Sequence, residues 1–170
     1  MKFALILILT LTFAFLGCSN PKNETAGEAE EQVEVNIDDA LAGYEGGTWI
    51  ESYEDAISFS KDLSRPILVN FTGSDWCGWC VRLSKEVFSQ KEFLDYAKTN
   101  LILLKLDFPK SIPQTDELKA QNQKLQDKFK IRGYPTILLI DSEGSEISRT
   151  GYREGGAASY VEHLKSMLTK

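Results

Sequence analysis

Two cysteines in this chain, Cys77 and Cys80, are separated only by Gly78-Trp79. The apolar run from Ile67 to Phe71 precedes the pair and predicts a buried strand. A helical pattern of apolar residues begins at the first cysteine and continues beyond the second. The pair is therefore expected where a buried strand turns into a helix, with both thiols in the first turn of that helix.

Two thiols in the first turn of a helix suit disulfide exchange. The N-terminus of a helix presents unpaired N–H groups and a partial positive charge, and both favour a thiolate over a thiol at Cys77. The thiolate is the nucleophile in disulfide exchange. Residues three apart share a helix face, so Cys80 can attack a mixed disulfide formed at Cys77. We predict Cys77 as the nucleophile and Cys80, the more buried, as the resolving thiol. Their redox-active disulfide would serve in place of a cofactor.

Other uses of such a cysteine pair fit the sequence less well. A structural zinc ion needs four ligands, whereas the body of the chain offers these two cysteines and the single histidine, His163. No metal site is therefore predicted. Covalent haem attachment needs a histidine directly after the second cysteine, where Val81 stands. A purely structural disulfide remains an alternative, although so short a loop would constrain the unfolded chain little.

The beginning of the chain predicts export. Lys2 is followed by an uncharged, almost wholly apolar stretch from Phe3 to Leu16. That stretch is shorter than the roughly 20 residues of a membrane-spanning helix and is typical of a signal peptide. The segment Phe15-Leu16-Gly17-Cys18 resembles the lipobox of bacterial lipoproteins, although its first two residues are not the preferred ones. The resemblance implies a signal peptide over 1–17 and a lipid on Cys18. An ordinary cleaved signal with a chance cysteine is the alternative.

Residues 18–48 differ in composition from the rest of the chain and predict an acidic, flexible tether. Part of this segment packing as an irregular N-terminal arm is the alternative. Its acidic residues include Glu24, Glu28, Glu30, Glu31, Glu34, Asp38 and Asp39. The net charge of the whole chain is −6, and no basic run stands out. Nucleic acid is therefore a poor partner, because phosphate binding needs clustered positive charge.

Residues 49–170 alternate between helical and strand-like patterns and predict one folded domain. The predicted helices span 51–64, 77–88 with 93–97 as an extension or a restart, 115–130 and 157–168. The predicted strands span 67–71, 101–107, 136–140 and 146–150, and a further short strand can form at Trp49. Alternation of strands and helices favours a parallel sheet, and a tight turn at 141–144 adds an antiparallel hairpin. The predicted fold is α/β, with a mixed central sheet flanked by helices on both faces.

Two segments of this domain resemble the thioredoxin superfamily. The segment from Ile67 to Cys80, ILVNFTGSDWCGWC, is similar to the strand and active-site turn of that family. The segment from Ile131 to Thr136, IRGYPT, is similar to the one that places a cis-proline opposite the dithiol. Bacterial envelope thioredoxin-like lipoproteins with a Cys-Gly-Trp-Cys motif share these features. The resemblance implies a thioredoxin-like fold and a cis peptide bond between Tyr134 and Pro135.

The resemblance also implies how a substrate peptide is held. In the family the cis-proline packs against the disulfide, and the residue before it offers backbone hydrogen bonds to the bound peptide. In this sequence these residues are Pro135 and Tyr134. Trp76 and Trp79 flank the dithiol and are expected to form an apolar rim on which the peptide docks. Simple packing and shielding is the alternative role of both tryptophans.

One departure from the family concerns proton transfer. The family carries a buried Asp that helps move protons at the resolving cysteine, and Asn70 stands at the matching position in this sequence. An amide cannot act as a base. Lys105, Asp75 or water are therefore the candidates for a proton path near Asn70.

The resemblance implies a thiol–disulfide oxidoreductase of the cell envelope that reduces or isomerises disulfides of exported proteins. A membrane electron donor would re-reduce it. A dithiol oxidase and a non-catalytic protein-binding module are the alternatives. Potentials in this fold run from about −270 to about −120 mV, so the scaffold does not fix the direction of electron flow. A lipid on Cys18 would anchor the domain facing the periplasm or the exterior. Ser19 after that cysteine, in place of Asp, favours the outer membrane over the inner.

Overall fold

A computed structural model of the chain describes residues 43–169. The predicted signal peptide, the lipidation site Cys18 and most of the predicted tether lie outside the described residues. The end of that tether, residues 43–48, is described, and it packs as the alternative N-terminal arm: Tyr44 is buried, and its hydroxyl donates to the Thr48 carbonyl at 2.9 Å and accepts from the Leu103 N–H at 3.1 Å. The folded domain therefore begins before Trp49. Across residues 43–169, no helix is both long enough and apolar enough to cross a bilayer.

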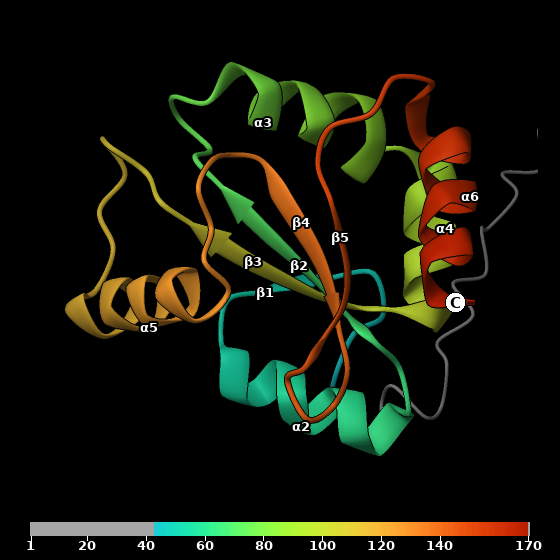
Figure 1. The fold of residues 1–170 in the computed structure, drawn as a ribbon, viewed down its shortest axis with the longest axis horizontal. Helices are drawn as coiled ribbons and strands as arrows, with labels where there is room; N and C mark the ends of the chain where they lie inside the picture. The colour runs from blue at the N-terminus through green and yellow to red at the C-terminus, as the bar shows by residue number, and fades with distance from the viewer. Residues whose placement is uncertain (1–42, 170) are drawn as a thin grey trace, which may run out of the picture. The chain divides into compact units, whose positions relative to one another are not determined.

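A mixed sheet of five strands forms the centre of the fold (Figure 1). Its strand order is β1-β3-β2-β4-β5. The strands are β1 (Trp49–Ile50), β2 (Ile67–Thr72), β3 (Ile102–Asp107), β4 (Thr136–Ile140) and β5 (Glu146–Thr150). Strands β1, β3 and β2 are parallel, whereas β4 runs antiparallel to both β2 and β5. This arrangement confirms the predicted mixed sheet, including the hairpin at its end.

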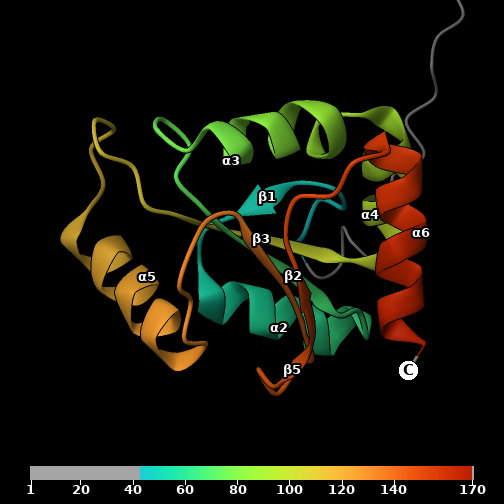
Figure 2. The same ribbon diagram turned by 45° about the horizontal axis from the view of Figure 1, so that its top comes forward.

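Helices cover both faces of the sheet, as predicted (Figure 2). The helices are α2 (Tyr53–Leu63), α3 (Gly78–Leu83), α4 (Lys91–Asn100), α5 (Asp116–Lys128) and α6 (Gly156–Leu168). A π-helical turn, η1 (Ser84–Phe88), follows α3. Residues of α3, η1, α4 and α6 pack in the core on one face, and residues of α2 and α5 pack in the core on the other.

The central strands are apolar along their whole length because each face meets a core. Every residue of β2 is buried. Its alternate side chains enter different cores, with Leu68 among the α3, α4 and α6 side chains and Val69 among those of α2 and α5. This explains why the strand appears in the sequence as a continuous apolar run rather than an alternating one. It also places the side chain of Asn70, two residues after Leu68, on the face that α3 covers.

The helical stretch after the dithiol restarts rather than continuing. It passes from α3 into η1, and α4 begins afresh after Gln90, whose backbone is extended. One residue of the apolar pattern, Val81, is half exposed. Cys80, Leu83 and Val87 take the buried side of this stretch, so Val81, one residue after Cys80, is turned away from the sheet.

Candidate active site

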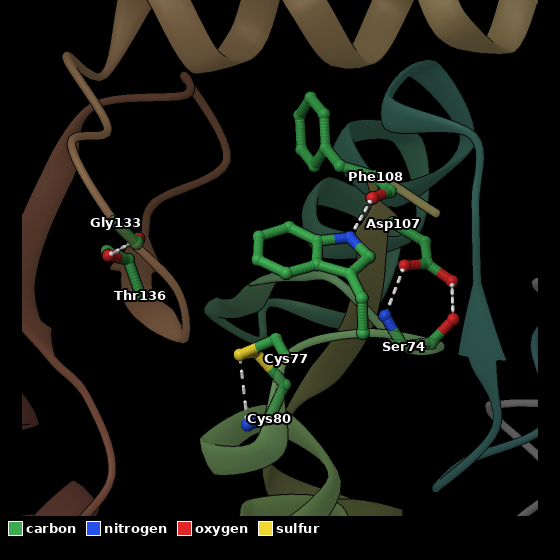
Figure 3. The surroundings of a disulfide bond; sticks show 8 residues. Ser74, Cys77, Cys80, Asp107, Phe108, Gly133 and Thr136 are labelled. Carbon is green, nitrogen blue, oxygen red and sulfur yellow. Dashed lines mark hydrogen bonds between the residues drawn. A yellow bond between two sulfur atoms is a disulfide. The ribbon is translucent and has the colours of Figure 1, made fainter. Parts of the chain in front are cut away.

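Cys77 and Cys80 form a disulfide at the beginning of α3 (Figure 3). Their Cα atoms are 5.2 Å apart. Cys77 occupies the N-cap position of the helix, and its Sγ accepts a hydrogen bond from the Cys80 N–H at 3.2 Å. The Cys77 N–H in turn donates to the Gly73 carbonyl oxygen at 2.9 Å. The sulfur of Cys77 thus takes the place of a capping side chain, where an N–H that points at it stabilises a thiolate.

The two cysteines are buried, and the tryptophans beside them are exposed. The exposed fraction is 7% for Cys77 and 4% for Cys80, so Cys80, the predicted resolving cysteine, is the more buried by a small margin. Trp76 is 42% exposed and Trp79 is 55% exposed. Exposed aromatic surface therefore lies next to the buried disulfide.

Trp76 is both exposed and firmly held. Its Nε1–H donates to the Phe108 carbonyl oxygen at 2.8 Å. Its ring meets Tyr134 edge-on at 5.7 Å between centroids, and the Lys110 Nζ lies 4.5 Å from its centroid. A Cβ at position 73 would come within 2.5 Å of Trp76 Cε2, so the ring fits only because residue 73 is glycine. Trp76 therefore packs against its neighbours, as one of the two predicted alternatives has it, while part of its ring stays exposed; its role in docking a peptide stays a prediction.

Replacing Gly73 by alanine is expected to displace the Trp76 ring, because the new methyl group would overlap it. The indole N–H signal of Trp76 should shift in an NMR spectrum as its bond to the Phe108 carbonyl lengthens, and the melting temperature should fall. Gly78→Ala is the matched control, because a Cβ there meets nothing within 4 Å. An unchanged Trp76 signal in Gly73→Ala would contradict the tight fit.

Trp79 is supported by three side chains that no sequence motif marks. Its ring lies 5.1 Å from the Tyr152 ring, and the Arg82 guanidinium carbon lies 5.5 Å from its centroid. The Tyr152 hydroxyl donates to Glu86 at 2.7 Å, and Arg82 pairs with the same carboxylate at 2.7 Å. The hydrogen bond from Tyr152, followed by the one from Arg82, lowers the pKa of Glu86. The cluster holds an exposed aromatic ring next to the dithiol.

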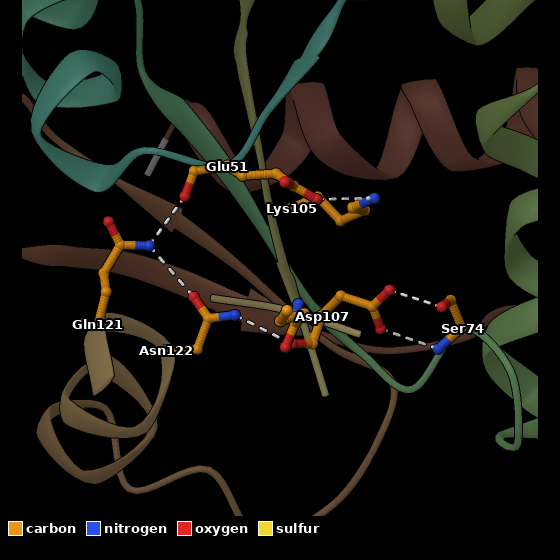
Figure 4. A network of polar contacts seen from close by, with 7 residues as sticks. Glu51, Ser74, Lys105, Asp107, Gln121 and Asn122 are labelled. Atoms are coloured by element: carbon orange, nitrogen blue, oxygen red, sulfur yellow. Dashed lines mark hydrogen bonds and ion pairs between the residues drawn. The ribbon is translucent and has the colours of Figure 1, made fainter. Parts of the chain in front are cut away.

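A buried carboxylate at the end of β3 holds the active-site loop (Figure 4). Asp107 accepts hydrogen bonds from Ser74 twice, from the N–H at 2.9 Å and from the hydroxyl at 2.5 Å. Its own carbonyl oxygen accepts from the buried Asn122 of α5 at 2.9 Å. The loop that precedes Cys77 is thereby fixed to β3 and, through Asn122, to α5. Neither Asp107 nor Ser74 was among the predicted site residues.

Asp107→Ala should destabilise the oxidised protein by about 2 kcal/mol, because the partly buried Ser74 N–H and hydroxyl both lose their acceptor. Ser74→Ala removes only the hydroxyl bond and should cost about 1 kcal/mol. Asp107→Asn keeps one acceptor oxygen, so its loss in the free energy of unfolding should lie between those of the other two variants. Urea unfolding of the three variants measures these differences. If Asp107→Ala and Ser74→Ala lost the same free energy of unfolding, the two hydrogen bonds from Ser74 to Asp107 would not both contribute.

The structure brings together two of the three residues considered for a proton path. Asn70 lies opposite Lys105 in the register of β2 and β3. The Asn70 side chain is buried, and its Oδ1 has no hydrogen-bond partner within residues 43–169. Lys105 Nζ forms an ion pair with Glu51 at 3.1 Å.

Asp75 has a different position from Asn70 and Lys105. Its carboxylate accepts hydrogen bonds from the backbone N–H groups of Lys110, at 3.0 Å, and Ser111, at 2.6 Å. These bonds lower the pKa of Asp75. A carboxylate with a lowered pKa is a weaker base, and its hydrogen bonds fasten the active-site loop to the segment after β3.

The segment from 131 to 135 lies across from the dithiol. Figure 3 shows Gly133 and Thr136 opposite Cys77 and Cys80, and the Thr136 hydroxyl donates to the Gly133 carbonyl at 2.8 Å. The peptide bond between Tyr134 and Pro135 is cis.

The Tyr134 ring connects this segment to Trp76. The Tyr134 ring contacts both Trp76 and Phe108, the latter at 5.3 Å between centroids. Burial raises the pKa of its hydroxyl. Among the described residues, no group of three or more His, Cys, Asp or Glu side chains is placed to hold a metal ion.

Comparison with known proteins gives consistent matches. Residues 53–165 match a family model described as a thioredoxin-like domain. The disulfide bond reductase DsbH of Chlamydia pneumoniae is 39% identical over 118 residues, which are 69% of this chain and 71% of that protein. The thioredoxin-related protein DsbJ of the same organism is 36% identical over 129 residues, but the match covers only 37% of its length. A solved structure described as DsbH oxidoreductase superposes with a TM-score of 0.69 at 38% identity, over 72% of this chain and 84% of that one.

Proposed function

This chain belongs to the thioredoxin-like domain family and is a thiol–disulfide oxidoreductase, and we propose that it reduces or isomerises disulfides of exported proteins. The observation that carries the proposal is the disulfide at the start of α3, with an N–H pointed at the Cys77 sulfur. The redox-active group is the cysteine pair itself. The direction of electron flow is supported by the 39% identity to a protein named as a disulfide bond reductase.

Reduction proceeds in two exchanges. The Cys77 thiolate attacks one sulfur of the substrate disulfide, forms a mixed disulfide and releases the other substrate sulfur as a thiolate, which takes up a proton. Cys80 then loses its proton and attacks the Cys77 sulfur. The second substrate sulfur leaves as a thiolate and takes up a proton, and the Cys77–Cys80 disulfide forms. Two electrons pass to the substrate, and a dithiol donor must restore them, for which we propose a membrane protein.

The residues around the disulfide position the substrate. Trp76 and Trp79 form the apolar rim, and the exposed area of both rings supports this role. Tyr134 would offer its backbone to the substrate peptide, and Pro135 would pack against the disulfide. Lys105 is the proposed route for the Cys80 proton, with water between them, because Asn70 carries no titratable group and lies directly opposite Lys105.

Equilibration with glutathione tests the direction. The reductase proposal predicts a potential nearer to the −270 mV end of the family range of about −270 to −120 mV, because a reductant must hold its electrons weakly. The reduced fraction is measured by alkylating free thiols at a series of glutathione ratios. A potential near −120 mV would instead support the alternative, a dithiol oxidase that donates disulfides to folding substrates.

A double variant, Cys77→Ser with Cys80→Ser, tests the other alternative, a binding module whose redox chemistry is incidental. The redox proposal predicts that this variant loses all biological activity while keeping its fold. Full activity of the double variant would support the binding module.

We also propose that the protein is a lipoprotein of the cell envelope. The basis is the sequence alone: a signal peptide over 1–17, a lipidated Cys18, and an acidic tether after it that joins the anchor to the folded domain. Ser19 favours the outer membrane. Cys18→Ala should release the protein from membranes or block its maturation, as cell fractionation would show. Unchanged membrane association would contradict the lipid anchor.

A further inference from the structure

A hollow lies beside the cis-proline segment, on the side that leads from α5 to β5. Its volume is about 530 Å³, and its lining residues are Lys130, Arg132, Gly133, Thr136, Arg149 and Thr150. Two of them, Gly133 and Thr136, lie across from Cys77 and Cys80 in Figure 3. A polypeptide that places its disulfide over the dithiol and continues along this segment therefore reaches the hollow.

The cations that line the hollow are not equivalent. Arg149 is neutralised by Glu146, with its Nε 2.6 Å from Oε1, and it also donates to the Phe129 carbonyl at 3.1 Å. Lys130 and Arg132 are exposed, and neither has an ion-pair partner within residues 43–169. In a chain with a net charge of −6, this hollow keeps two uncompensated positive charges.

The backbone at Lys130 points to a role for its side chain. Its φ is +53°, a left-handed conformation that disfavours any residue with a Cβ. It follows the end of α5, where glycine is the usual residue in this conformation. The conformation at the end of α5 therefore does not explain why residue 130 is a lysine. The Lys130 side chain does line the hollow, which gives it a position where its charge can act on a ligand.

A third cation lies over the ring of Trp76, at the apolar rim. The Lys110 Nζ lies 4.5 Å from the Trp76 centroid, and Lys110 also has no ion-pair partner in the described part of the chain. The Trp76 ring contacts Tyr134, which follows Arg132 by two residues. Positive charge therefore lies over Trp76 as well as in the hollow.

We propose that this hollow binds acidic side chains of the substrate, so that the enzyme prefers disulfides flanked by Asp or Glu. Charge complementarity carries the proposal, because Lys130 and Arg132 attract carboxylates and repel basic peptides at the edge of the docking surface. The inference rests on the proposed reductase function and adds a substrate class to it.

Three matched peptides test the preference. They carry the same disulfide and differ only in flanking residues, which are Glu, Gln or Lys. The wild-type protein should reduce the Glu peptide with a kcat/KM about fivefold above that of the Gln peptide, and the Lys peptide most slowly. The preference should weaken as salt is raised, because the charges are exposed. Lys130→Glu with Arg132→Glu should reverse the order and speed reduction of the Lys peptide, a gain that misfolding cannot produce.

Two further variants separate charge from fold. Lys91→Glu with Lys124→Glu makes the same charge change outside the hollow and should keep the wild-type preference. Lys130→Gly removes one charge and suits the left-handed backbone, so it should lower the preference without lowering the melting temperature.

The outcomes distinguish the two proposals. A wild-type protein without charge preference, or a preference that survives Lys130→Glu with Arg132→Glu, would overturn the acidic-substrate inference and leave the reductase function standing. Failure of the wild-type protein to reduce even a small neutral disulfide, bis(2-hydroxyethyl) disulfide, would overturn the reductase function itself.

Discussion

Cys77→Ser is expected to lower the rate of disulfide reduction by more than about a thousandfold, because a serine hydroxyl cannot replace the thiolate nucleophile. Insulin turbidity or a peptide disulfide assay measures the rate. The fold should persist, since serine is close in size to cysteine and can occupy the same N-cap position. A melting temperature for the reduced wild-type protein provides the proper reference, because the variant also lacks the disulfide.

Cys80→Ser is the matched comparison. It keeps the nucleophile and loses only the resolving thiol, so it should complete the first exchange and then stall as a mixed disulfide. The two roles would be reversed if Cys80→Ser lost the first exchange while Cys77→Ser retained it. The hydrogen bond that the Cys77 sulfur accepts from the Cys80 N–H favours Cys77 as the nucleophile.

Asn70→Asp is expected to lower the free energy of unfolding of the oxidised protein. The site is buried on the face that α3 covers, and its Oδ1 has no partner in the described structure. Burial raises the pKa of a carboxyl group there above its value in the unfolded chain. With a rise of about 2 units, the charged form would cost about 3 kcal/mol at neutral pH. Lys105, directly opposite, reduces the cost in part.

The sign of the pH dependence follows from that raised pKa. The folded variant binds its proton more tightly than the unfolded chain does, so stability falls as the pH rises above the unfolded pKa of about 3.9. The loss is complete once the pH passes the folded pKa. Asn70→Leu is the control, because it has a similar volume and no titratable group. Urea unfolding of both variants between pH 4 and pH 8 measures the difference, and parallel curves would contradict the buried position.

Much of the fold is predictable because its signals are local. β2 and β3 appear as continuous apolar runs since both faces of the sheet are covered, and the hairpin between β4 and β5 follows from its turn residues. The dithiol and the proline segment are each short motifs whose residues are adjacent in sequence. The break between η1 and α4 is not predictable from the pattern, because the apolar spacing fits either a continued or a restarted helix.

The contacts that hold the site are not predictable in the same way. Ser74 and Asp107 are 33 residues apart, and Tyr152 and Glu86 are 66 apart. Serine, aspartate and tyrosine are common at surfaces and in loops, so nothing local marks these pairs. The one available signal was position, because Asp107 ends a buried strand beside the strand that leads to Cys77. A carboxylate there must find donors nearby, and the active-site loop provides them.

Covalent trapping is the most direct test of disulfide exchange through Cys77. Cys80→Ser, expressed in its own cells, should accumulate in mixed disulfides with exported proteins, linked through Cys77 and released by dithiothreitol. Mass spectrometry of the trapped species identifies both the linking cysteine and the partners. Exchange through Cys77 predicts that partners are bound at that residue. It also predicts that the double variant, Cys77→Ser with Cys80→Ser, traps no partner. No trapped partner with Cys80→Ser, or the same partners when Cys77 is also replaced, would contradict it.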